Sequence, residues 1–289
     1  MGITNKEIHY PRSVFGTEKS RRRVAMRRAR LVIFYLSLGL AGVLSIMFLP
    51  DLLATLVTGW TASGAAELGM HRLHVMGIAT VVSVFLLGLF AQAYRPRQRV
   101  AAMWGAFAVI LSVSLGTVWY GVGRPEEVLP FLTLTSIALL AHPAGRDMLR
   151  RSAQYSPALL ALLAVAAIPI LAFVAGQLSL TTSSVDPHAL DGHYVMMVGL
   201  MVAPLAYGIF AALRFSGWRL AAWLAGLPMM YYGMMSIAFP LQSGSTGVFW
   251  GVLAILWAIA FVTVAESSRA VDSELLRQRV EPILSRSRQ

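Results

Sequence analysis

A glutamate and two histidines lie close together in the stretch ELGMHRLHVMG, residues 67–77. Glu67, His71 and His74 are spaced i, i+4 and i+7, so on an α-helix their side chains share one face. Imidazole and carboxylate groups are ligands for zinc, copper and iron in proteins. The stretch therefore predicts one half of a metal or haem site at the start of a helix.

A second stretch, VDPHALDGHYVMMVG at residues 185–199, again places histidine and carboxylate side chains ahead of an apolar segment. Asp186 followed by Pro187 predicts a helix cap and a first-turn proline, and hence a short helix leading into that segment. If the two apolar segments meet, they bring six N and O ligands to one end of the molecule. The predicted metal ligands are Glu67, His71, His74, His188, Asp191 and His193.

The chemistry of this predicted site is restricted by the absence of cysteine, which excludes disulfides, iron–sulfur clusters and thiolate metal sites. Copper, zinc or iron bound by imidazole and carboxylate remains, as does a b-type haem with His74 and His193 as axial ligands from facing helices. The alternative is that these polar side chains lie at the water-exposed ends of membrane helices and hold nothing.

The composition is typical of a polytopic membrane protein. Hydrophobic residues make up 57% of the 289 residues and charged residues only 13%, with a mean hydropathy of +0.67. Soluble domains carry about 25% charged residues. A net charge of +11 would suggest a nucleic-acid partner in a soluble protein. Here the basic residues cluster beside the apolar segments, so we expect a bilayer with anionic headgroups as the partner and no nucleic acid.

Eight apolar segments are long enough, or nearly so, to cross a bilayer, which takes about 20 helical residues. The sequence therefore predicts an all-α protein with eight transmembrane helices near residues 31–54, 71–93, 101–122, 128–143, 157–178, 193–213, 219–239 and 247–265.

The basic residues predict how these helices are oriented. With eight spans, all of the 24 lysines and arginines except Arg72 and Arg124 fall in the two termini and in the loops on the side of the termini. Cytoplasmic loops carry this excess of positive charge. We therefore expect the protein to reside in the prokaryotic cytoplasmic membrane, with both termini in the cytoplasm and the histidine-rich stretches on the outer face.

Two cytoplasmic turns resemble each other and predict an internal duplication. GLFAQAYRPRQRVAA (residues 88–102) and GIFAALRFSGWRLAA (residues 208–222) match at an offset of 120 residues. Each is the turn between the second and third spans of a four-span unit, which predicts two parallel repeats. The expected division is a basic arm (1–30), a first four-helix unit (31–152), a second four-helix unit (153–265) and a charged helical tail (266–289).

No phosphate-binding loop, dinucleotide fingerprint or nucleophile–base pair is present, so no residue is assigned a catalytic role. The leading interpretation is a membrane protein with an outward-facing metal or haem site and a redox or metal-handling role. One alternative is a structural or accessory subunit that binds other membrane subunits or copies of itself. Another is a transporter of a neutral or lipid-like substrate, which would require a cavity reaching the middle of the membrane.

Overall fold

The computed structural model describes residues 14–61, 66–150, 152 and 154–286, and their side chains over 20–61, 72–150, 152 and 154–268. The regular elements in these ranges are all helices, without a strand. They are α1 (Val14–Ile46), α2 (Leu49–Thr58), α3 (Ala66–Phe90), α4 (Val100–Tyr120), α5 (Pro125–Ala141), α6 (Pro157–Leu180), α7 (Pro187–Leu190), α8 (His193–Ala212), α9 (Trp218–Ala238) and α10 (Gly247–Arg286), with 3₁₀ turns at Ala91–Ala93, Pro96–Gln98 and Gly145–Leu149.

Seven of the described helices, α1, α3, α4, α6, α8, α9 and α10, are long and apolar enough to cross a membrane. The prediction of an all-helical, membrane-type protein is therefore confirmed. The eighth predicted span corresponds to α5, which has 17 residues and is about 25 Å long. The count of eight spans stays a prediction.

The first span differs from its predicted range of 31–54. Helix α1 begins at Val14, within the predicted basic arm, and ends at Ile46, and after a short turn α2 begins at Leu49. Pro50 lies in the first turn of α2. Proline lacks a backbone N–H and clashes with the preceding helical turn, so it is favourable at a helix start and unfavourable in a continuous helix. The chain is therefore interrupted before Pro50.

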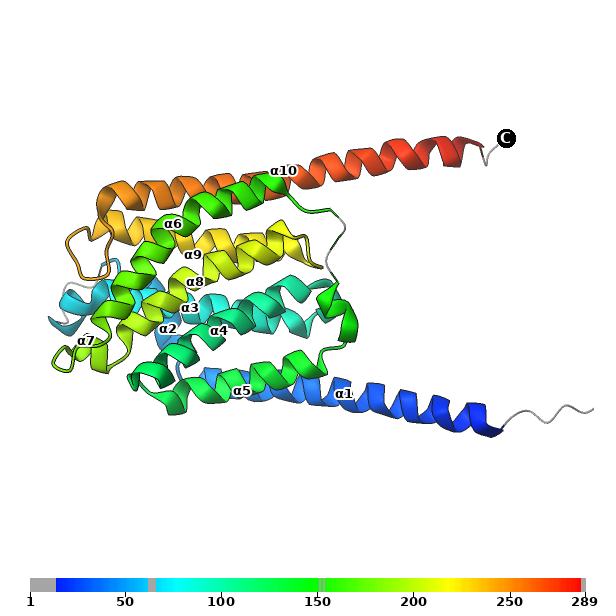
Figure 1. Cartoon of the computed structure of the whole chain (residues 1–289), viewed down its shortest axis with the longest axis horizontal. Helices are drawn as coiled ribbons and strands as arrows, with labels where there is room; N and C mark the ends of the chain where they lie inside the picture. Colours follow the sequence, from blue (N-terminus) through cyan, green and yellow to red (C-terminus); the bar gives the residue numbers. More distant parts are fainter. Residues whose placement is uncertain (1–13, 62–65, 151, 153, 287–289) are drawn as a thin grey trace, which may run out of the picture.

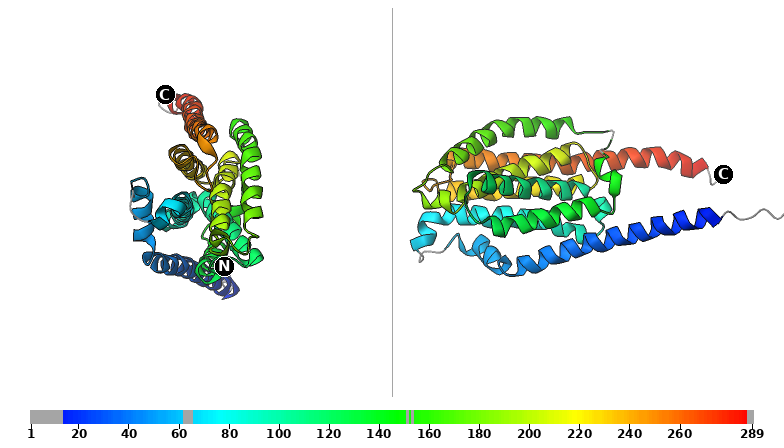
Figure 2. Two further views of the ribbon diagram at one scale, coloured as in Figure 1. Left: turned by 90° about the vertical axis from the view of Figure 1, so that its left-hand side faces the viewer. Right: turned by 60° about the horizontal axis from the view of Figure 1, so that its bottom comes forward.

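Four helices, α3, α4, α8 and α9, form the interior of the bundle, and pairs of helices flank them on opposite sides (Figure 1). In the interior helices, between 61% and 72% of the most apolar stretch is buried, against 22% to 28% in α1, α6 and α10. Helix α5 packs on α1 and α4, and α10 packs on α9 and α6. Figure 2 shows α1 beginning and α10 ending at the same end of the bundle, beyond the other helices.

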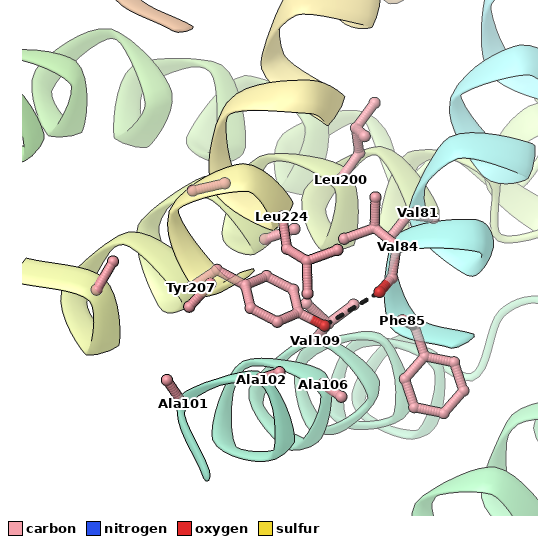
Figure 3. Close-up of a cluster of buried hydrophobic side chains, with 14 of the residues drawn as sticks. Val81, Val84, Phe85, Ala101, Ala102, Ala106, Val109, Leu200, Tyr207 and Leu224 are labelled. Carbon is pink, nitrogen blue, oxygen red and sulfur yellow. Dashed lines mark hydrogen bonds between the residues drawn. The ribbon is translucent and has the colours of Figure 1, made fainter. Parts of the chain in front are cut away.

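Tyr207 of α8 fixes the distance between the interior helices. Its side chain is fully buried, and its hydroxyl donates a hydrogen bond of 3.1 Å to the carbonyl oxygen of Val84 on α3 (Figure 3). Gly88 on α3 and Gly105 on α4 make room for it, because a Cβ at either position would overlap the Tyr207 side chain. Small residues thus let α3, α4 and α8 approach closely around one large side chain.

We expect Gly105→Ala to destabilise the protein, because the added methyl group must displace the buried ring of Tyr207. Overpacking of this kind costs about 1–3 kcal/mol. Gly176→Ala in α6 is the matched control, since a Cβ there meets nothing within 4 Å and alanine favours a helix over glycine. Thermal unfolding in detergent should show a lower midpoint for Gly105→Ala alone. Equal midpoints would show that Tyr207 does not set the spacing.

Candidate metal centre

Three histidines from two separate parts of the chain come together at the end of the bundle opposite the start of α1 and the end of α10 (Figure 1). His74 lies on α3, His188 on α7 and His193 at the start of α8. The ring centroids are 4.9 Å apart for His74 and His188, 5.6 Å for His188 and His193, and 5.8 Å for His74 and His193. His74 is fully buried, whereas the other two are partly buried.

The local structure between α6 and α8 positions two of these rings. The Asp186 side chain caps α7 by accepting a hydrogen bond of 2.9 Å from the His188 backbone N–H, as the sequence predicted. After this single turn, Gly192 adopts a left-handed conformation (φ 73°) and the chain enters α8 at His193. The Gly123 N–H donates to the carbonyl oxygen of Leu190 at 2.7 Å, which holds the turn against the α4–α5 connection.

Asp186 also fixes the orientation of the His188 ring. One carboxylate oxygen lies 3.0 Å from His188 Nδ1, and the other accepts a hydrogen bond of 2.6 Å from the Tyr194 hydroxyl. The hydrogen bond from Tyr194, followed by those from His188, lowers the pKa of Asp186, so the group is a carboxylate at neutral pH. The proton of His188 therefore belongs on Nδ1, and the lone pair of the ring is on Nε2. Carboxylates orient metal-binding histidines in this way.

The connection between α9 and α10 covers His74. Gln242 accepts a hydrogen bond of 3.2 Å from the Leu73 N–H, and Tyr232 donates one of 2.9 Å to the Gly244 carbonyl oxygen. Gly244 has φ 83°, and a Cβ there would lie 3.0 Å from His74 Nε2. The backbone of this connection therefore lies directly against the imidazole, which only glycine permits at this conformation.

The three histidines are close to the geometry that one metal ion requires. One ring nitrogen from each lies within 4.8 Å of the other two. Nitrogen ligands about 2.0–2.1 Å from one ion cannot be more than about 4.2 Å apart. Nitrogens separated by 4.8 Å would therefore have to approach by about 0.6 Å for a common ion to bind all three.

Of the other predicted ligands, Asp191 is the one whose side chain the structure describes. Asp191 is exposed beside the turn into α8 and does not belong to the three-histidine cluster. The side chains of Glu67 and His71 lie outside the described part of the structure. Their predicted ligand roles, like that of Asp191, stay predictions.

Three residues that shape the cluster were not predicted as part of the site: Asp186, Tyr194 and Gly244. Tyr194 and Gly244 carry no metal-ligand signal, and Asp186 was predicted only as a helix cap. Its position two residues before His188 was the available signal, because a capping carboxylate at that spacing also reaches the imidazole Nδ1.

The remaining described histidine, His142, is at the opposite end of the bundle. It is fully buried, its Nδ1 accepts from the Ala144 N–H at 3.2 Å, and its Nε2 therefore donates to Gln92 Oε1 at 3.3 Å. Gln92 in turn donates to the carbonyl oxygens of Gly88 and Arg99. This closed hydrogen-bond network gives His142 a role in the fold.

No protein-family model, no curated protein and no solved structure matches this chain. Fold and site together define a membrane-type helical protein with a histidine cluster that could hold a metal ion.

We expect Asp186→Asn to lower thermal stability at pH 6, with a difference from the unaltered protein that shrinks as the pH falls toward 3. The pKa of Asp186 is lowered by folding, so its contribution is present above the unfolded value of about 3.9 and is lost as the carboxylate protonates. The exposed Asp191 supplies the control Asp191→Asn in the same loop. Identical unfolding midpoints at pH 6 would show that Asp186 does not position the loop.

Proposed function

We propose that the protein is an integral membrane protein that binds one transition-metal ion, copper, zinc or iron, through His74, His188 and His193, in a redox or metal-handling role. The observation that carries the proposal is the convergence of three imidazole nitrogens within 4.8 Å at the end of the bundle. Neutral imidazole is a ligand for all three metals. The carboxylate on His188 Nδ1 adds the orientation expected of a metal ligand.

Three histidines leave at least one coordination position for a further ligand. In zinc proteins, three protein ligands with an open position are typical of sites where water or a substrate binds the metal, whereas structural sites have four protein ligands. If a fourth protein side chain completes the coordination in place of water or a substrate, the candidates from the sequence are Glu67, His71 and Asp191.

A b-type haem with His74 and His193 as axial ligands is less well supported. Helices α3 and α8 do contact each other, as that interpretation required. However, the His188 ring is 4.9 Å from His74 and 5.6 Å from His193, so it lies within the area that a porphyrin between them would cover. At Gly77 of α3 the space beside the backbone is filled by a side chain, because a Cβ there would lie 2.6 Å from Met197 Sδ.

We further propose that α5 is an eighth span and that the two halves are parallel repeats. Helix α5 runs beside α1 in the bundle, and α1 begins at the end where α10 finishes, as an even number of crossings requires (Figure 1). Arg95 and Arg214, with φ 52° and 51°, are the left-handed non-glycine residues of the described chain. At the offset of 120 residues Arg95 aligns with Phe215, so the two left-handed residues are one position apart in the two similar turns. Those turns also meet, since Ala101 N–H donates to the Ser216 carbonyl oxygen at 2.9 Å.

In this topology, the distribution of basic residues supports a cytoplasmic position for the start of α1 and the end of α10, and an outer position for the three histidines. The arm and tail then lie beside the anionic headgroups of the inner leaflet. The metal site would exchange with the extracytoplasmic space.

We expect the purified protein to retain about one equivalent of copper, zinc or iron per chain, and His188→Ala to retain less than about a tenth of that, because the remaining two imidazoles form a much weaker site. Asp186→Asn should weaken binding by about 10–100-fold through loss of the orienting carboxylate. Elemental analysis and a competitive chelator titration measure both. Asp147→Asn, which removes an exposed carboxylate at the other end of the bundle, is the control and should bind like the unaltered protein.

We expect the bound ion to raise the unfolding midpoint, and its removal by EDTA to lower it. A ligand at 100 times its dissociation constant stabilises the folded state by about 2.7 kcal/mol. The same treatment should leave the midpoint of His188→Ala unchanged. A visible spectrum with an intense haem band, or a chain without stoichiometric metal after supplementation with each of the three ions, would contradict the proposal.

A further inference from the structure

A cavity of about 870 Å³ lies beside the histidine cluster, between the α1–α5 pair and the interior helices α3 and α4. It begins at the α7–α8 turn and at the start of α5, and it extends along α3 from Ile78 to Leu86, two helical turns toward the other end of the bundle. This volume is within the range of about 300–1,000 Å³ that small-molecule sites occupy.

The deep part of the cavity is apolar and its edge opens beside exposed apolar side chains. Phe85 and Ile110 line the deep part, along with valine and leucine side chains of α3 and α4. Leu44 of α1 and Met47, in the turn that follows α1, form part of the edge and are 38% and 85% exposed. In a helix that faces lipid, such a rim lets a ligand enter from the bilayer.

The outer end of the cavity is polar and carries mainly negative charge. Glu126, Glu127 and Asp191 line it together with the single cation Arg124, and Arg124 is paired with Glu127 at 2.9 Å. An anionic headgroup would meet an excess of carboxylates, which disfavours it. A neutral head with hydrogen-bond donors or acceptors has partners here, including the buried Thr117.

His193 belongs to both the metal cluster and the wall of this cavity. A ligand that fills the outer end of the cavity therefore contacts one of the imidazoles that would hold the ion.

From these features we propose that the cavity binds an uncharged amphipathic molecule of the quinone or quinol class, with its ring at the outer, polar end and its hydrocarbon chain between α1 and α3. Quinone carbonyls accept hydrogen bonds and quinol hydroxyls donate them, and both suit the mixed groups at that end. The apolar stretch along α3 and α4 accommodates the chain. The inference goes beyond the metal site and does not require it to be filled.

The test uses a decyl-substituted benzoquinone and the full-length protein in nanodiscs of phosphatidylcholine, with empty nanodiscs as the blank. We expect saturable binding of about one quinone per chain. Val82→Trp fills the cavity and should weaken binding at least tenfold, which corresponds to about 1.4 kcal/mol. Ile78→Trp, one turn earlier and also lining the cavity, should have the same effect and guards against a folding defect in the first variant.

Leu87→Trp is the matched control, because Leu87 lies on the same helix but is 58% exposed and does not line the cavity. Its quinone binding should equal that of the unaltered protein. His188→Ala should lose the metal and keep the quinone, whereas Val82→Trp should keep the metal and lose the quinone, so failure of one site is distinguishable from failure of the other.

The proposal is overturned if the protein in nanodiscs binds no more quinone than the blank, or if Val82→Trp and Ile78→Trp bind it as well as Leu87→Trp does. Saturable binding of a spin-labelled phospholipid chain in this cavity, without competition by the quinone, would overturn it in favour of a lipid site.

Discussion

The close contact of α3, α4 and α8 is the constraint on which the rest of the molecule depends. A tyrosine hydroxyl buried among apolar side chains requires an acceptor, since leaving it unsatisfied costs about 1–3 kcal/mol. Tyr207 meets this requirement at the Val84 carbonyl oxygen, and it can do so only because Gly88 and Gly105 leave space for its ring. The separation of α3 and α8 is thereby set, and with it the distance between His74 and His193 on the same two helices.

Each of the three histidines is positioned by a different local contact. His74 depends on the packing of α3 and on the glycine backbone of the α9–α10 connection. His188 depends on a carboxylate that caps its helix and contacts its ring at once. His193 depends on the left-handed Gly192, which turns the chain into α8. The cluster therefore connects the first half of the chain to the second.

The membrane-type helical fold could be predicted because runs of apolar residues determine it directly. The histidines of the cluster could be selected by their type and by their position at two helix starts. Three features could not be predicted. Pro50 divides the first apolar run into two helices, and an average of hydropathy over that run does not detect the break. The role of Gly244 depends on a contact between segments far apart in the sequence, and that of Tyr194 depends on a turn that brings its hydroxyl back to Asp186, eight residues earlier. The cavity beside α1 depends on a gap between helices, and no local pattern encodes a gap.

The contact between Gly244 and His74 has a kinetic consequence. Because the backbone of the α9–α10 connection lies against the buried imidazole, the approach to the cluster on that side is closed, and His188 and His193 form its accessible side. An ion held by the three rings would leave on the side of His188 and His193, or the connection would have to open and break its hydrogen bonds to Leu73 and Tyr232. Opening of this segment would add a second route of exchange, so a change in the segment could alter the residence time of an ion without altering its coordinate bonds.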